Sequence, residues 1–406
     1  MTKYALYKYS TDNIGDDIQS LAARRFLPRV DYYIDRDQVG LFQAKDNTDE
    51  IKLIANGWYL HSPYAWPPTD SNLHPLLISM YFNMNNKDVA NAVQSSQSIA
   101  FLHRYGNQGG GVGARDLGTK NMLQDLGIPA YFSGCLTLTL QRDNQLARQD
   151  YVLCVDVSDE VYQMICKNTN RPVIKMTPQI TPTLDRSERF TLAELFLTAY
   201  QAAHAVVTSR LHCVLPCMAL QTPVLHVKSK GIQNYPRFAG LERLVRSIEE
   251  NEYLGHYDLF QVDSPPGNSK DYLTLREQLI NTAQKYTGFD SEKSFRIKTD
   301  GLELNADILA TIMRFIEPSW TQYTNQKHLI RARTQAQNNY VELQRAQQQA
   351  QHNYQALQRV QAEAVQNYQA FVQAQAEAVR NYEELQKVLI ELAAYRNLVQ
   401  GGASGD

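Results

Sequence analysis

The sequence predicts an α/β protein in which two successive βα domains are followed by a long helical coiled coil. Three observations carry this prediction: a strand–loop–helix–turn–strand unit over residues 205–227, a series of βα alternation that restarts at Tyr151, and an abrupt change of composition near Asn325. Strands joined through a helix are typical of parallel sheets. With 406 residues, the chain is long enough for two or three structural units.

Composition excludes several classes of protein. Hydrophobic residues make up 43% of the chain and charged residues 20%, and the net charge of −2 gives no sign of a nucleic-acid partner. The five cysteines contain no CxxC pair, which favours reduced thiols. The N-terminus reads as a strand and not as a signal peptide, and no apolar run approaches the ~18 residues of a membrane span. We therefore expect a cytoplasmic protein without a membrane span.

The first domain is expected over residues 1–147. A strand from Tyr4 to Tyr9 precedes a helix whose apolar positions recur every three to four residues. Asn13 and Gly15 form the turn between them, where Gly15 allows a ligand close to the backbone. Asp16 follows in the first helical turn, where it either borders a ligand site or only satisfies the helix dipole.

The later part of this domain contains a second candidate cation. A short strand is expected at residues 98–101, followed by a Gly-rich loop, Gly106 to Gly113, which fits neither the dinucleotide nor the P-loop fingerprint. A helix is expected over residues 117–126. Arg115 stands at its start, where a cation is electrostatically unfavourable, and this conflict indicates that it faces an anion or an acid.

The second domain is expected over residues 148–318 and contains the central unit. Arg210 and His212 fall where the first strand of that unit ends and its helix begins. Ligands collect at the carboxyl ends of parallel strands, and helix N-termini favour anions. Arginine supplies a fixed planar charge and histidine can move protons near neutral pH. On the residues alone, a structural role for both is as good an interpretation as a ligand site: the arginine would pair with an acid of the protein, and the histidine would be hydrogen-bonded inside the core.

Four segments carry a resemblance to a known family: TDNIGDDIQSLAARRFLP, VGARDLGTKNMLQDLGIPAYFSGCLTLTL, TSRLHCVLPCMALQTPVL and KSKGIQNYPRFAGL. They resemble, in the same order, the polysaccharide pyruvyl transferases, whose Arg-Leu-His signature the third contains. The resemblance spans residues 1 to about 310 and implies two Rossmann-like domains facing a cleft, as in two-domain (GT-B-like) glycosyltransferases. It also implies transfer of a pyruvyl group from phosphoenolpyruvate to a hydroxyl pair of a cell-surface or exported polysaccharide. A ketal forms and phosphate is released, with no metal and no cofactor besides this donor.

That chemistry suggests roles for the candidate residues. The donor carries a phosphate and a carboxylate, so its site needs several cations. The donor-binding candidates, in order of preference, are Arg210, Arg115 and then the basic residues after the second strand of the central unit, Lys228, Lys230 and Arg237. His212 is expected to act as the acid/base group. The resemblance places three further residues at the border of the cleft: Asn13, Gly15 and Asp16.

Two other functions remain open. In the first, the same cations hold the diphosphate of a nucleotide sugar and the protein is a glycosyltransferase. In the second, the globular part has lost its activity and the protein is a scaffold that works through its C-terminal helix.

The C-terminal segment, residues 325–399, is predicted to be a coiled coil. The dipeptide Asn-Tyr recurs with a 14-residue period from Asn339 to Tyr382, and fourteen residues are two heptads. With Tyr340 at position a, bulky seam layers alternate with Gln/Ala layers. We expect a helix on the order of 100 Å long that joins copies of this chain, although it could also fold back on the globular part. Residues 400–406 read as a flexible tail.

Overall fold

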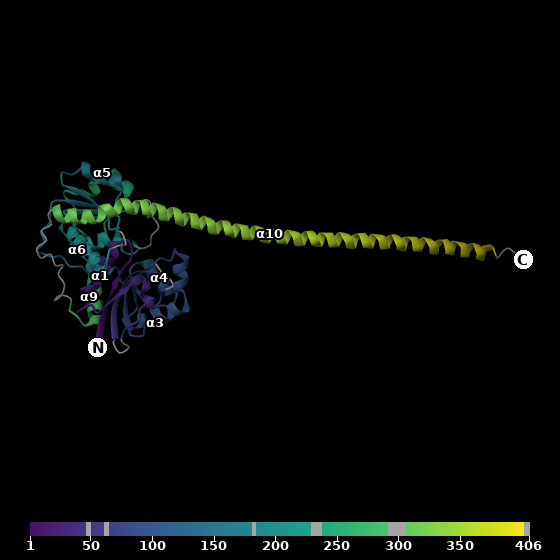
Figure 1. The fold of residues 1–406 in the computed structure, drawn as a ribbon, viewed down its shortest axis with the longest axis horizontal. Helices are drawn as coiled ribbons and strands as arrows, with labels where there is room; N and C mark the ends of the chain where they lie inside the picture. Colours follow the sequence, from purple (N-terminus) through teal and green to yellow (C-terminus); the bar gives the residue numbers. More distant parts are fainter. Residues whose placement is uncertain (46–49, 61–64, 181–183, 229–237, 291–305, 402–406) are drawn as a thin grey trace. The chain divides into compact units, whose positions relative to one another are not determined.

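The computed structural model describes all residues except 46–49, 61–64, 181–183, 229–237, 291–305 and 402–406 (Figure 1). In the long C-terminal helix it describes the side chains of residues 343, 346–347, 349–394 and 396–397. By their contacts, residues 1–323 form one compact unit and residues 324–406 a second. The predicted boundary between residues 147 and 148 lies inside the first unit and stays a prediction.

The first sheet has six described strands, all parallel. They are β1 (Thr2–Lys8), β2 (Tyr32–Asp35), β3 (Glu50–Tyr59), β4 (Leu73–Phe82), β5 (Val112–Ala114) and β6 (Ala130–Phe132), in the order β2-β1-β3-β4-β5-β6. The long strand β4 is apolar and buried along nearly its whole length, as expected of a parallel strand covered on both faces. The helices of this half are α1 (Ile14–Arg24), η1 (Arg36–Leu41), α2 (Lys87–Val93), α3 (Ser96–Gly109), α4 (Leu117–Asp125) and η3 (Leu136–Thr139).

The second sheet has five described strands, again all parallel. They are β7 (Val152–Val155), β8 (Val173–Met176), β9 (Ala205–Thr208), β10 (Val224–Lys228) and β11 (Ser247–Glu249), in the order β11-β10-β9-β7-β8. The helices that accompany them are α5 (Asp159–Lys167), α6 (Arg186–Ala202), α7 (Leu211–Ala219), α8 (Glu250–Gly255), η5 (Tyr257–Phe260) and α9 (Leu273–Thr287).

Both sheets reverse their strand order at an equivalent place. In the first sheet, β2 lies on one side of β1, and from β3 the chain continues on the other side through β4, β5 and β6. In the second sheet, β8 lies on one side of β7, and from β9 the chain continues on the other side through β10 and β11. In open α/β sheets, ligands bind outside the carboxyl ends of the strands at such a switch point. The prediction of an α/β protein with two parallel sheets is confirmed, and its topology directs attention to the residues that follow β1, β7 and β9.

Helix α1 joins the two halves of the first unit. It belongs to the first sheet by sequence, yet it packs against α6 and α7 of the second half, and α1 and α6 lie next to each other where the halves meet (Figure 1). Ile14, Ile18 and Leu21 of α1 share one buried apolar cluster with Phe196 of α6 and Leu215 of α7. The cluster is continuous across both halves, so the α1 N-terminus is held by packing from both.

Two local expectations were wrong. Residues 98–101, expected as a strand, lie inside α3, whose N-cap Ser95 accepts a hydrogen bond from the backbone N–H of Ser98. A short apolar run does not distinguish strand from helix, and here the cap decides. Half of the expected Gly-rich loop is helix as well, and its last two residues begin β5. Helix α3 continues through Gly109 and ends at Gly110, whose φ of 79° is the left-handed conformation that glycine adopts at helix ends.

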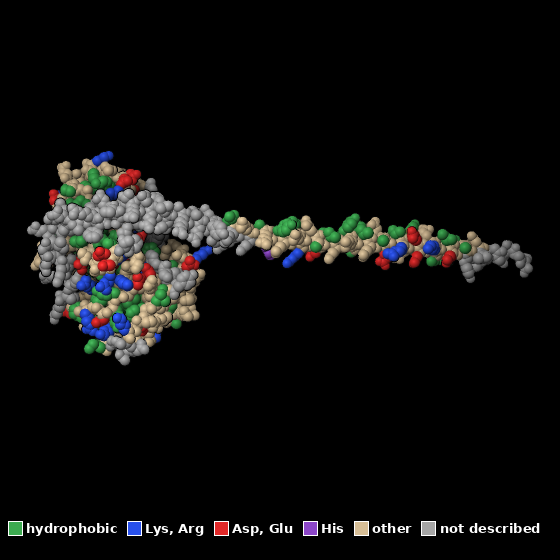
Figure 2. All heavy atoms as spheres, viewed as in Figure 1, with side chains coloured by type: hydrophobic (Ala, Val, Ile, Leu, Met, Phe, Trp, Pro, Cys, Tyr) green, Lys and Arg blue, Asp and Glu red, His purple; other side chains and the backbone are tan. Residues whose placement is uncertain are grey.

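The C-terminal helix α10 (Ala306–Gly401) starts before the expected Asn325. Its described seam side chains are exposed, among them Tyr354 (62%), Tyr368 (68%) and Phe371 (63%). Figure 2 shows hydrophobic side chains recurring along the described part of this helix. Among the described residues, no helix has both the length and the apolar character needed to cross a bilayer. The long helix is therefore present, and the coiled coil stays a prediction.

Candidate active site

The carboxyl edges of the two sheets are joined by backbone hydrogen bonds. The segment after β1 runs beside the segment after β8: Ile14 N–H donates to the carbonyl of Pro178 (2.8 Å), and Ile180 N–H donates to the carbonyl of Asp12 (2.8 Å). Asn13, between these two bonds, forms an isolated antiparallel bridge with Gln179. The region that follows β1 is thus fixed against the second half of the protein.

Gly15 and His212 meet at this junction. A Cβ placed on Gly15 would lie 3.0 Å from Cβ of His212 and 3.3 Å from its Nδ1. Asn13 caps α1, since its Oδ1 accepts a hydrogen bond from the N–H of Gly15 (2.8 Å). The structure therefore brings together three residues that the sequence suggested separately, and glycine at position 15 avoids a tight contact between a side chain there and His212.

The backbone at His212 departs from the helix that contains it. His212 has a φ of −85° and a ψ of 23°, and four residues later Pro216 interrupts the hydrogen bonding of α7. Proline has no N–H, so the carbonyl of His212 lacks its usual helical donor. All nine residues of α7 are buried, which fixes the imidazole in position at the start of the helix.

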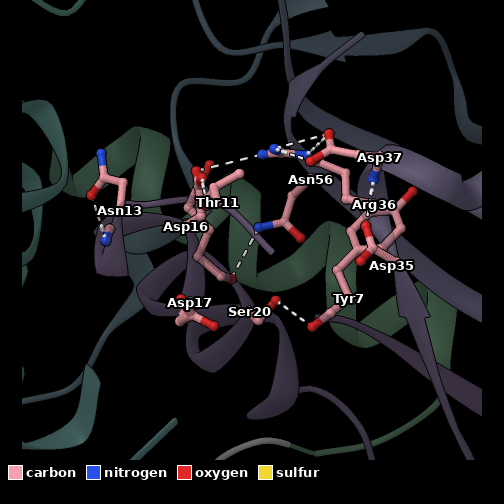
Figure 3. A network of polar contacts seen from close by, with 12 residues as sticks. Tyr7, Thr11, Asn13, Asp16, Asp17, Ser20, Asp35, Arg36, Asp37 and Asn56 are labelled. Atoms are coloured by element: carbon pink, nitrogen blue, oxygen red, sulfur yellow. Dashed lines mark hydrogen bonds and ion pairs between the residues drawn. The ribbon is translucent and has the colours of Figure 1, made fainter. Parts of the chain in front are cut away.

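Asp16 is the centre of a network of polar contacts at the same edge of the first sheet (Figure 3). Its carboxylate accepts hydrogen bonds from Oγ1 of Thr11 (2.8 Å) and Nε2 of Gln19 (3.1 Å). Nη1 of the buried Arg36 lies 3.5 Å from Oδ1 of Asp16, and Nη2 of Arg36 lies 3.1 Å from Oδ1 of Asp37. Arg36 is neutralised by two carboxylates, so its charge is already used within the protein.

Asp17 and Arg189 form a buried pair between α1 and α6. Nη2 and Nε of Arg189 lie 2.6 and 3.2 Å from the two carboxylate oxygens of Asp17, and Nη1 donates to the carbonyl of Thr11 (2.7 Å). Burial raises the pKa of Asp17 from 3.8 to about 6, against the opposing effect of Arg189. Every nitrogen of this guanidinium has a partner, so Arg189 is a structural residue.

Arg210 follows β9, and its guanidinium is engaged on one side. Its Nε pairs with Oδ2 of Asp156, the residue that follows β7. Within the described part of the chain, no hydrogen bond or ion pair reaches either Nη atom, and a quarter of the side chain is exposed. Arg210 therefore presents two nitrogens at the switch point of the second sheet.

Arg115 follows β5 and is completely buried. Its guanidinium lies over the ring of Tyr81, 4.5 Å from the centroid, and none of its three nitrogens has a hydrogen-bond partner in the described part of the protein. The carboxylate of the adjacent Asp116 caps α4 instead, accepting the N–H of Thr119 (2.8 Å). Strands β3 and β4 separate β5 from β1 in the first sheet, a distance of three strand spacings, on the order of 14 Å.

The remaining basic candidates are less informative. Lys228 ends β10 and lies 3.2 Å from Oε1 of Glu249, with both side chains about half exposed. Lys230 and Arg237 lie outside the described residues. Over the ranges that the structure does describe, no group of His, Cys, Asp or Glu side chains is arranged to hold a metal ion.

The sequence reasoning missed Asp156, Arg36 and Arg189. For Asp156 a signal was available, because it is an acid directly after a buried strand, the position where polar site residues collect. For the two arginines there was none. Arg189 pairs with an acid 172 positions away, and local sequence contains no record of such a contact.

Comparison with known proteins identifies the family of this chain. Residues 13–231, more than half of the chain, match a family model described as polysaccharide pyruvyl transferase. The match includes the segments after β1, β5, β7 and β9. No curated protein matches the chain.

Proposed function

This chain belongs to the polysaccharide pyruvyl transferase family and is a transferase, and we propose that it transfers the pyruvyl group of phosphoenolpyruvate to two hydroxyls of a saccharide. The acceptor belongs to a cell-surface or exported polysaccharide, the product is a ketal, and phosphate is released. The proposed reaction needs no metal or further cofactor, and we place it in the cytoplasm.

One observation carries this proposal: the arginines near the sheet edges divide into two kinds. Arg36 and Arg189 are neutralised by acids of the protein. Two nitrogens of Arg210, and all three nitrogens of the buried Arg115, have no hydrogen-bond partner among the described residues. A buried charge is costly unless it is paired, so the guanidinium of Arg115 favours an anionic ligand, and that of Arg210 offers two further donors to one. Phosphoenolpyruvate offers a phosphate and a carboxylate, both of which arginine binds through paired hydrogen bonds.

His212 is assigned the proton transfers. One acceptor hydroxyl attacks the carbon that carries the phosphate, and its proton is moved to the methylene, which becomes a methyl group. The second hydroxyl then attacks the same carbon, the bond to phosphate breaks, and the second proton leaves with the phosphate. A single imidazole can accept and return a proton in each half of this sequence. The observation that supports this role is the position of His212 beside Gly15, where the edges of the two sheets meet.

The first test is phosphate release from phosphoenolpyruvate in the presence of a panel of saccharides. Wild type should release phosphate only with a suitable acceptor, and His212→Ala should abolish release without loss of the fold. His204→Ala is the matched control, because His204 precedes β9 and lies at the opposite end of the strand from His212. Retained activity in His212→Ala would remove it as the acid/base group. Binding of a nucleotide sugar without binding of phosphoenolpyruvate would instead favour a glycosyltransferase.

We also propose that α10 joins copies of this chain. Within residues 339–394, every charged residue lies at heptad positions b, c or f, and positions e and g, which flank the seam, contain none. Copies of the helix can therefore approach through the seam without like-charge repulsion. The exposed Tyr, Leu and Phe side chains supply the apolar surface that such a contact would bury.

A further inference from the structure

Asp156 has a backbone conformation that its residue type rarely adopts. It follows β7 directly and has a φ of 50°, in the left-handed region. A residue other than glycine is strained there, although Asp and Asn tolerate it better than most. Strain of this kind persists where the surrounding structure imposes it, and it collects at functional sites.

Hydrogen bonds among the ends of β7, β8 and β9 hold this conformation. The N–H of Asp156 donates to the carbonyl of Met176 (3.1 Å), and its own carbonyl accepts from Oγ of Ser209. Oγ1 of Thr208 donates to the carbonyl of Val155 (3.0 Å) and accepts the N–H of Arg210 (3.0 Å). The backbone on both sides of the switch point is thereby fixed before any ligand arrives.

The side chain of Asp156 uses this fixed position to hold Arg210. The carboxylate accepts a hydrogen bond from Nε of the guanidinium, and over the described ranges of the chain the two Nη atoms have no partner and are available to a ligand. A free arginine side chain loses rotamer freedom when it binds an anion, which weakens binding. An arginine held by its Nε has already lost most of that freedom, so binding gains affinity.

We propose that Asp156 is a positioning residue that holds the guanidinium of Arg210 so that its two Nη atoms receive an anionic group of the donor. This inference rests on the proposed function, because it takes phosphoenolpyruvate as the ligand. The group received is the phosphate or the carboxylate, and titration with inorganic phosphate and with pyruvate distinguishes the two.

Asp156→Gly is the informative variant, because glycine adopts a positive φ without strain and has no carboxylate. We expect a melting temperature equal to or above that of wild type, a KM for phosphoenolpyruvate raised about tenfold or more, and a kcat that changes much less. Asp156→Asn tolerates the same φ and keeps an oxygen for the Nε–H, so its KM should rise only a few-fold. In an Arg210→Ala background, Asp156→Gly should add no further loss, since the two residues act as a unit.

Asp263→Asn is the control. Asp263 pairs with Arg171 (3.1 Å), which precedes β8 and so lies at the opposite edge of the same sheet. Its KM should equal that of wild type. An unchanged KM in Asp156→Gly, with an active wild type, would overturn the positioning role and leave the proposed function intact. A wild type that binds neither phosphoenolpyruvate nor inorganic phosphate in calorimetry would overturn both. Additive losses in the double variant would show that Asp156 acts independently of Arg210.

Discussion

Replacing Arg115 with Met should stabilise the ligand-free protein while it abolishes the response to phosphoenolpyruvate. The side chain is 0% exposed, and its nitrogens have no hydrogen-bond partner in the described part of the chain. Burying an ion costs several kcal/mol even after relaxation. The ring of Tyr81 returns about 2 kcal/mol of this cost through a desolvated cation–π contact. We therefore expect Arg115→Met to raise the free energy of unfolding by about 1–4 kcal/mol.

Arg189→Met provides the contrast, because the two arginines are equally buried. Arg189 is paired with Asp17 through two hydrogen bonds, so removing it leaves a buried carboxylate without its partner. Breaking a buried pair in this way costs about 3–5 kcal/mol. The same substitution should thus have opposite signs at the two positions, because Arg189 is hydrogen-bonded to its carboxylate, whereas Asp116, the acid beside Arg115, makes no hydrogen bond to Arg115 in the described part of the chain.

The assay is chemical denaturation with and without phosphoenolpyruvate. At a concentration of 100 Kd, the donor should raise the stability of wild type by about 2.7 kcal/mol and that of Arg115→Met by much less. If Arg115→Met loses as much stability as Arg189→Met, the argument that Arg115 awaits an anion is wrong. An undiminished stabilisation of Arg115→Met by phosphoenolpyruvate would show that the anion binds elsewhere.

Three further predictions concern other parts of the structure. Gly15→Ala should lower kcat about 10- to 100-fold by displacing His212, whereas Gly255→Ala, where a Cβ has nothing within 4 Å, should leave kcat unchanged in the same assay. Asp17 binds a proton more tightly in the folded state, since its pKa is about 6 there against 3.8 ordinarily, so the stability it contributes is present below pH 4 and lost as pH rises through 6. The free energy of unfolding of wild type relative to Asp17→Asn should accordingly fall by about 2.4 kcal/mol between pH 4 and 7, and a flat difference would contradict the shift. Phe371→Glu should dissociate the assembly in analytical ultracentrifugation but leave phosphate release intact, and an unchanged mass would exclude this face of α10 as the contact.

The wrong expectations at residues 98–113 show that a short local pattern does not decide between strand, helix and loop. A four-residue apolar run is compatible with either type of element, and glycines fit a loop as well as a helix end. The caps at Ser95 and Gly110 resolve both ambiguities in the structure. A longer pattern was read correctly: the helix expected over residues 117–126 is α4 (Leu117–Asp125), because its length and periodicity leave little choice.

The sequence by itself determined the α/β class, the parallel strands, the long terminal helix and the placement of Arg210 and His212 after a strand. These follow from spacing along the chain, which local sequence records. Only the tertiary structure decided which charges remain available for a ligand, since that depends on partners far away in sequence. Arg189 meets an acid 172 positions away, and Arg210 meets one 54 positions away that engages only its Nε, the Nη atoms having no partner among the residues that the structure describes. Pairing across a parallel sheet is set by strand order, and strand order emerges only when both sheets and the helix between them are packed together.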